Sequence, residues 1–304
     1  MSTPEARNEE NAREKEISSE FPFESNFVEV NGSDIHYVDV GEGDPVLFLH
    51  GNPTWSYLWR NIIPHLQPEA RCIAPDLIGM GKSDKPDIDY TFEDHYGYIE
   101  AFVDELGLED ITLVVHDWGS GIGFHYAHTH PGNVIGIAFM EAIGRPVSWE
   151  RMPRDLRIAF RLMRTPVVGW LMISAGNMFV NRALPDGIQR DLTDEEFRRY
   201  KEPYPTITSR KPVRVWPLEV PIDGTPARVH DKVAAYSEWL THTDIPKLYL
   251  YAQPGVINQD EAVEYIENNF TDTTMVDLGE GLHYLQEDHP HRIGEEIASW
   301  YTNL

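Results

Sequence analysis

The residues best suited to chemistry lie in one short stretch of the chain, Thr112 to Phe124. The apolar residues before His116 predict a buried strand, and the residues from Trp118 onward follow a helical pattern rich in small side chains. A strand that turns sharply into a helix exposes the residue at the turn, which is the arrangement of a nucleophile elbow. Asp117 occupies that position. Because a carboxylate is already ionised at neutral pH, Asp117 is expected to attack carbon without a base and form an alkyl ester.

Three other polar side chains follow predicted strands. Asn52 comes after the apolar run Pro45–Leu49, and Glu141 ends a later strand. His283 lies in the loop after the last predicted strand. Open α/β sheets bind ligands at the carboxyl ends of their strands, so these side chains should meet Asp117 there. The order nucleophile, acid, histidine along the chain is that of an α/β-hydrolase triad.

The elements that position these residues alternate along the chain, which predicts an α/β fold with a mostly parallel sheet flanked by helices. The strands are expected at 26–30, 34–40, 45–49, 71–74, 111–115, 134–140, 247–251 and 274–278. The helices are expected at 56–66, 91–106, 118–130, 229–240, 260–268 and 290–301. The first two strands should form a hairpin at Asn31-Gly32.

The alternation breaks once, and this break defines the expected domains. Residues 144–225 contain helical segments and prolines but no convincing buried strand, which predicts a helical cap inserted into the sheet. Residues 23–143 and 226–304 then form the core. Residues 1–22 are polar and are expected to be a disordered acidic tail.

The amino-acid composition limits the classes of partner and the cellular location that we expect. The formal charge of −25 argues against nucleic acid or an anionic membrane as partner. The acidic surface fits either a halophilic, salt-adapted source or an ordinary acidic protein. The chain has one cysteine, Cys72, and no apolar run long enough to span a bilayer, so we expect a cytoplasmic protein.

Taken together, these stretches resemble the haloalkane dehalogenases, in the subgroup with an Asp-His-Glu triad and an Asn-Trp halide clamp. The resemblance runs from about residue 23 to the C-terminus and is weakest at 144–200 and 253–259. The matching stretches are His50-Gly-Asn-Pro-Thr54, Asp76-Leu-Ile-Gly-Met-Gly-Lys-Ser83, His116-Asp-Trp-Gly-Ser120, Phe139-Met-Glu-Ala142 and Gly281-Leu-His-Tyr-Leu-Gln-Glu-Asp288.

The resemblance implies an eight-stranded α/β-hydrolase fold with a cap domain and a role for each residue. Asp117 would be the nucleophile, while Asn52 and Trp118 would bind the halide and supply the oxyanion hole. His283 would be the general base, oriented by Glu141. The substrate would be a haloalkane and the products an alcohol, a halide ion and a proton, with no metal or cofactor. The protein would be a monomer or a weak homo-oligomer.

The sequence leaves alternatives to several of these assignments. Asp260 follows the next strand, where other α/β-hydrolases place their acid, and it competes with Glu141. His289 and His291 compete with His283. Two other patterns are better explained by ordinary structural roles. His125, His128 and His130 could suggest a metal site, but they lack a further ligand at suitable spacing. Gly119-Ser-Gly-Ile-Gly123 could suggest a dinucleotide loop, but its glycine spacing is wrong.

Three alternatives to a haloalkane dehalogenase remain open from the sequence. An epoxide hydrolase would need a lid tyrosine, for which Tyr200, Tyr204 and Tyr236 are available. Against it, Asn52 stands where those enzymes typically have Phe. A coelenterazine-type luciferase shares the same motifs. A non-catalytic hydrolase-fold binding protein would show no turnover, which an intact triad disfavours.

Overall fold

The computed structural model describes residues 16–304, and its core is one sheet of eight strands in the order β1-β2-β4-β3-β5-β6-β7-β8. The strands are β1 Asn26–Val30, β2 Ser33–Val40, β3 Pro45–Leu49, β4 Arg71–Pro75, β5 Ile111–Asp117, β6 Val134–Ala142, β7 Lys247–Pro254 and β8 Thr273–Gly281. Only β1–β2 and β2–β4 pair antiparallel; the remaining neighbours are parallel. The predicted fold class is confirmed.

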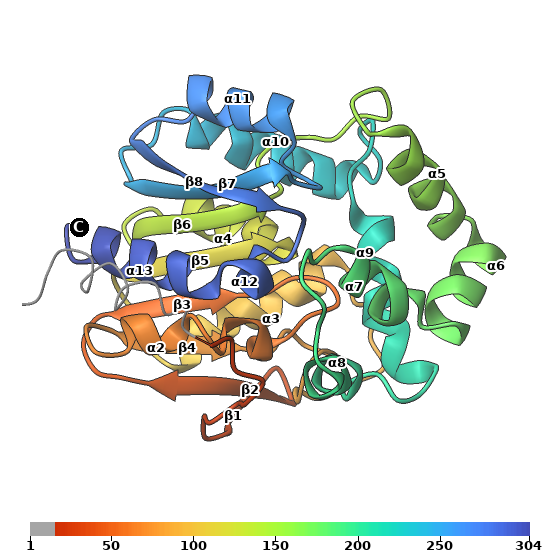
Figure 1. Ribbon diagram of the computed structural model, residues 1–304, viewed down its shortest axis with the longest axis horizontal. Coiled ribbons are helices and arrows are strands. Elements are labelled where there is room, and N and C mark those ends of the chain that lie inside the picture. The colour runs from red at the N-terminus through yellow and green to blue at the C-terminus, as the bar shows by residue number, and fades with distance from the viewer. Residues whose placement is uncertain (1–15) are drawn as a thin grey trace, which may run out of the picture.

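Helices cover both faces of this sheet (Figure 1). Behind the sheet in that view, α4 (Trp118–Thr129) packs with α3 (Phe92–Glu105) and α10 (Ala227–Leu240). In front of it, α13 (Pro290–Tyr301) packs on the short helix α2 (Ile63–Leu66). The central strands are therefore buried on both sides, which is why they read as continuous apolar runs.

Local signals explain where α3 begins and ends. The side chain of Thr91 accepts a hydrogen bond from the N–H of Asp94, and the carboxylate of Asp94 accepts one from the N–H of Thr91. This reciprocal capping box starts α3 where the predicted helix 91–106 begins. Gly107, just past the end of α3, has a φ of +57°, a conformation that glycine adopts without strain.

Residues 144–225 form helices that lie beyond the carboxyl ends of the strands, at the right of Figure 1. They connect β6 to α10 and contribute no strand to the sheet, although Val147 and Ile222 form an isolated parallel bridge. The α-helices here are α5 Arg154–Met163, α6 Pro166–Gly169, α7 Leu184–Asp186, α8 Asp194–Lys201 and α9 Lys211–Glu219. Two π-helical stretches, η2 Trp170–Ala175 and η3 Phe179–Ala183, and the 3-10 turn η4 Thr208–Arg210 complete the segment.

Two expectations need correction. The predicted helix at 56–66 is two pieces, the 3-10 turn η1 (Ser56–Trp59) and α2, with Pro64 at the second position of α2. Residues 16–22 are not a disordered tail: Asn61 bonds Ser18, and the ring of Phe21 packs 5.2 Å from that of Trp55. The remainder of that predicted tail, residues 1–15, lies outside the described residues.

Within residues 16–304, no single helix is both long and apolar enough to cross a membrane. One pair of helical pieces, Arg154–Met163 and Pro166–Ala175, passes that test together by length and composition, but the pair is bent by 94°.

Candidate active site

Asp117 sits at the turn between β5 and α4 in a backbone conformation with φ +48° and ψ −126°. A non-glycine residue rarely adopts this region, so the surrounding structure must hold it there. Two glycines permit the tight turn. A Cβ at Gly51 would lie 2.2 Å from Oδ2 of Asp117, and a Cβ at Gly119 would lie 2.0 Å from the carbonyl oxygen of Leu49. Gly51 and Gly119 thus allow close packing at the elbow.

The carboxylate of Asp117 is buried, and one of its oxygens is held by a backbone donor. The N–H of Asn52 donates to Oδ2 at 2.8 Å. Burial raises the pKa of Asp117 above its ordinary value, although the neighbouring His283 and the N–H groups of Asn52 and Trp118 act in the opposite direction. These groups therefore favour the ionised form of the buried carboxylate.

His283 faces two carboxylates. Its Nδ1 lies 3.0 Å from Oε2 of Glu141, and its Nε2 lies 3.9 Å from Oδ1 of Asp117. Because a carboxylate only accepts, Nδ1–H is the donor and Nε2 is left to receive a proton. Burial alone would lower the pKa of His283, but the hydrogen bond to Glu141 and the charge of Asp117 outweigh it and raise the pKa above 6.5.

Glu141 is buried at the end of β6, with a φ of +42° that aims its side chain toward the loop after β7. The N–H groups of Val256, Ile257 and Asn258 all donate to its carboxylate, at 2.7 to 3.2 Å. A buried charge is tolerated when it is this fully hydrogen-bonded. Glu141 is consequently a fixed partner for His283.

Asn52 and Trp118 bring side-chain N–H groups to the same place. The amide of Asn52 donates to the carbonyl oxygen of Val213 in α9 at 3.3 Å, which fixes its plane and leaves its second N–H available. None of the hydrogen bonds of residues 16–304 uses the indole N–H of Trp118. The indole ring stacks on that of Trp216, with centroids 4.5 Å apart. Both side chains are therefore oriented by residues of α9.

These side chains line a cavity of about 430 Å³ between the sheet and residues 144–225. Besides the polar residues above, its lining is largely apolar and includes Leu156, Phe160, Met163, Phe179 and Ile266. The volume suits a small organic molecule rather than a polymer. An ionised carboxylate, two N–H donors and an imidazole around an apolar cavity can displace an anionic leaving group and then hydrolyse the resulting ester.

The rival residues lie elsewhere. Asp260 is exposed at the first position of α11 (Asp260–Asn269). His289 bonds the carbonyl oxygen of Glu280, and His291 bonds His65. The three candidate lid tyrosines are buried outside the cavity: Tyr200 donates to Glu287, Tyr236 donates to Ile143, and Tyr204 is also absent from the lining.

Sequence reasoning missed several supporting groups. The cradle for Glu141 lies in residues 253–259, where the only local signal is the turn sequence Pro254-Gly255. A Cβ at Gly255 would lie 2.9 Å from Oε1 of Glu141. Tyr284 lines the cavity and donates its hydroxyl to the carbonyl oxygen of Asn52 at 3.1 Å. Its position next to His283 in the chain is the sequence signal that could have identified Tyr284 as a residue of the site.

Known proteins share this architecture over nearly the whole chain. Residues 44–290 match the model of the alpha/beta hydrolase fold. The chain is 45% identical to a haloalkane dehalogenase of Mesorhizobium japonicum, covering 90% of this chain and 89% of that protein. It is 42% identical to one of Sphingobium indicum, covering 93% and 97%. The crystal structure of a haloalkane dehalogenase from Bradyrhizobium elkani superposes with a TM-score of 0.91 at 42% identity, covering 92% and 98%. The chain belongs to the haloalkane dehalogenase family of α/β hydrolases.

Proposed function

We propose that this protein hydrolyses haloalkanes to alcohols through a covalent ester on Asp117. One observation carries the proposal: a buried carboxylate shares an apolar cavity with the indole of Trp118 and the amide of Asn52. A departing halide is large and weakly basic, so it needs hydrogen-bond donors and not a proton. This arrangement provides donors for such an ion within reach of the nucleophile.

In the first step, an oxygen of Asp117 attacks the carbon that bears the halogen. The carbon–halogen bond breaks as the carbon–oxygen bond forms, and its electron pair leaves with the halide. The N–H groups of Asn52 and Trp118 stabilise the ion, which replaces the hydration it would have in water. The step needs no base, which agrees with the 3.9 Å separation of His283 and Asp117.

In the second step, water attacks the carbonyl carbon of the ester. His283 accepts a proton from the water at Nε2, while Glu141 holds the imidazole and stabilises its cationic form. The backbone N–H groups of Asn52 and Trp118, which both interact with the carboxylate of Asp117, stabilise the oxyanion that forms there. Collapse of the intermediate breaks the ester bond. The departing alkoxide takes the remaining proton of the added water and leaves as the alcohol, Asp117 returns to a carboxylate, and the other proton then leaves His283.

We further propose that residues 144–225 act as a cap over residues 23–143 and 226–304, since they supply most of the apolar cavity lining. A monomer or weak homo-oligomer agrees with a net charge of −25, which makes copies repel one another. A cytoplasmic location agrees with a single cysteine, Cys72, which is free and buried.

Tyr200, Tyr204 and Tyr236, the lid tyrosines that epoxide opening would use, do not line the cavity. Tyr265 and Tyr284 do line it, but both lie outside residues 144–225, and the hydroxyl of Tyr284 donates to the carbonyl oxygen of Asn52. Epoxide opening is therefore disfavoured. The deciding experiment incubates the purified protein with 1-bromobutane, 1,2-dibromoethane and other short haloalkanes, at low and high salt. Bromide and acid should appear in equal amounts. Separate assays with styrene oxide and coelenterazine test the two alternative activities, epoxide hydrolysis and light emission. Release of diol or light without halide from any haloalkane would overturn the proposed function.

A further inference from the structure

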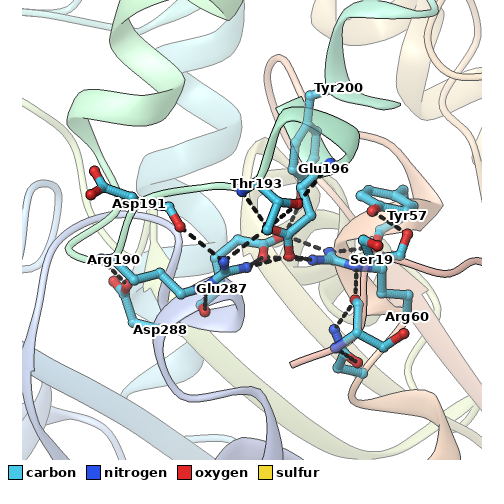
Figure 2. Close-up of polar contacts among 12 residues, drawn as sticks. Ser19, Tyr57, Arg60, Arg190, Asp191, Thr193, Glu196, Tyr200, Glu287 and Asp288 are labelled. Atoms are coloured by element: carbon cyan, nitrogen blue, oxygen red, sulfur yellow. Dashed lines mark hydrogen bonds and ion pairs between the residues drawn. The ribbon is translucent and has the colours of Figure 1, made fainter. Parts of the chain in front are cut away.

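A buried ionic cluster joins residues 144–225 to the chain just past His283 (Figure 2). Arg60 of the core lies 2.6 Å from Glu287 and 2.7 Å from Glu196 of α8. Arg190, in the loop before α8, reaches the same two carboxylates at 2.5 and 2.6 Å, and the hydroxyl of Tyr200 donates to Glu287. Glu287 belongs to α12 (Leu285–Asp288), four residues after His283. We call these five residues the ionic cluster.

The ionic cluster continues into direct backbone contacts with the loop of His283. The carbonyl oxygen of Gly187 accepts hydrogen bonds from the N–H groups of His283 and Tyr284, both at 3.0 Å. The carboxylate of Asp288 accepts from the N–H of Arg190, whose guanidinium also donates to the carbonyl oxygen of Glu287 at 2.6 Å. Residues 187–196 thus accept hydrogen bonds from His283 and Tyr284 and donate hydrogen bonds to α12.

His283 is fixed at three points, and each comes from a different part of the chain. Glu141 of β6 accepts from its ring. His116 of β5 donates from Nε2 to its carbonyl oxygen at 2.9 Å. Gly187 accepts from its N–H. Only the last of these contacts belongs to residues 144–225.

Stability alone does not explain why this cluster is ionic, because buried apolar side chains can stabilise a fold equally well. The side chains of Arg60, Glu196 and Glu287 are at most 1% exposed, so their desolvation offsets much of the attraction between them. Two arginines and two glutamates balance in charge, and their geometry is specific. Buried ion clusters of this kind can select one arrangement of the chain over others.

We infer that residues 187–196 form a clamp that positions His283, with Arg190 and Glu196 as its positioning residues. The inference rests on the proposed function, because it separates the two chemical steps. Asp117 ends β5, Trp118 follows it, and Asn52 lies in the loop after β3. The five side chains of the ionic cluster do not line the cavity. Loosening the clamp therefore slows ester hydrolysis, which needs His283, far more than ester formation, which the clamp reaches only through Tyr284 and the carbonyl oxygen of Asn52.

Two substitutions test the clamp with little change in side-chain size. Glu196→Gln keeps the shape of the side chain but removes its charge, and Arg190→Met removes a guanidinium whose side chain is 23% exposed. The matched control is Glu195→Gln, on the neighbouring residue, which pairs with Arg198 and Arg199 on the same exposed helix surface. Arg190→Lys, which retains the charge, should restore part of the lost rate.

Rapid mixing with 1,2-dibromoethane resolves the steps, since bromide appears with ester formation and the alkyl-enzyme mass decays with hydrolysis. In Glu196→Gln and Arg190→Met, hydrolysis should slow about tenfold or more, because small misplacement of a catalytic group is costly. Ester formation should stay within about twofold. Glu195→Gln should match wild type in both steps.

Amide hydrogen exchange supplies a readout that does not depend on turnover. The peptide that contains His283 and Tyr284 should lose protection in Glu196→Gln and Arg190→Met, because their N–H groups bond Gly187. Unchanged protection, or equal slowing of both chemical steps, would overturn the clamp. A wild-type protein that released no halide would overturn the proposed function, and the exchange result would still decide the clamp.

Discussion

The Nε2 atom of His283 lies 3.9 Å from Oδ1 of Asp117 and makes no hydrogen bond to it. In a serine hydrolase the histidine contacts the nucleophile because it must remove a proton. Asp117 has no proton to lose when ionised, so the histidine is free to serve a later water. The separation suits a base that acts through one water molecule.

Replacing His283 with Phe should trap the reaction halfway. Asp117 should still be alkylated, because attack needs no base, but the ester should persist because water is no longer activated. Intact-protein mass spectrometry after exposure to 1-bromobutane should show one added butyl group, and peptide mapping should place it on Asp117. Wild type treated in parallel should show no lasting adduct. An adduct on another residue would remove Asp117 as nucleophile.

The ester-hydrolysis rate should fall on the acid side of its pH profile. His283 accepts a proton only when neutral. Burial lowers its pKa and the hydrogen bond to Glu141 raises it, while the charge of Asp117, which also raises the pKa in the free enzyme, is lost when the ester forms. Protonation of the imidazole therefore removes the base as the pH falls. Single-turnover decay of the alkyl-enzyme measured from acid to alkaline pH checks this. A decay rate that stays constant across the acid range contradicts it.

Replacing Glu141 with Gln should reduce turnover roughly a thousandfold or more, as expected when the partner that fixes a histidine tautomer is lost. Asp260→Asn is the matched control, because this exposed residue follows the next strand without contacting His283. It should leave turnover within about twofold of wild type. The comparison needs steady-state bromide release and an unfolding curve for each variant. The opposite ranking would move the acid of the triad to Asp260.

Removing the side-chain amide of Asn52 tests the halide site. Asn52→Ala should slow ester formation on the order of a hundredfold, the usual cost of losing one donor to a developing anion. The bromide burst under rapid mixing measures this step. Hydrolysis of any ester formed should change less, because the backbone N–H of Asn52 remains in place. A normal burst in a folded variant would exclude the amide as a halide ligand.

The sequence predicted the sheet and the elbow because both rest on local patterns. Buried parallel strands give apolar runs, and Asp117 lies where such a run meets a helix. The cradle around Glu141 was not predictable in this way, because it uses backbone N–H groups of a loop without periodicity. Phe21 and Phe23 were apolar signals in a polar stretch, and their packing explains why residues 16–22 are ordered.

The ionic cluster was hidden for a different reason. Arg60 bonds partners 136 and 227 residues away, and no local pattern links such positions. Each arginine and glutamate of the cluster, taken alone, looks like an ordinary surface charge in an acidic chain. Only the fold brings them together and buries them.

The ionic cluster also predicts how stability depends on pH. Burial opposes ionisation of Glu196, but hydrogen bonds from Arg190 and Thr193 and the charge of Arg60 outweigh it and lower its pKa to about 2, against an ordinary 4.5. A carboxylate with a lowered folded pKa adds stability above pH 4.5, which is lost as the pH falls toward 2. That difference corresponds to about 3 kcal/mol at neutral pH. Glu196→Gln should lose about this amount.

Urea unfolding of wild type and Glu196→Gln at pH 7 and near pH 3 measures this effect. The two proteins should differ clearly at pH 7 and converge as the pH falls, because Gln cannot lose a charge that wild type loses. Glu195→Gln should differ from wild type by no more than about 0.5 kcal/mol at pH 7, since its ion pairs are exposed. A gap between wild type and Glu196→Gln that stayed constant with pH would show that Glu196 acts through shape and not through its charge.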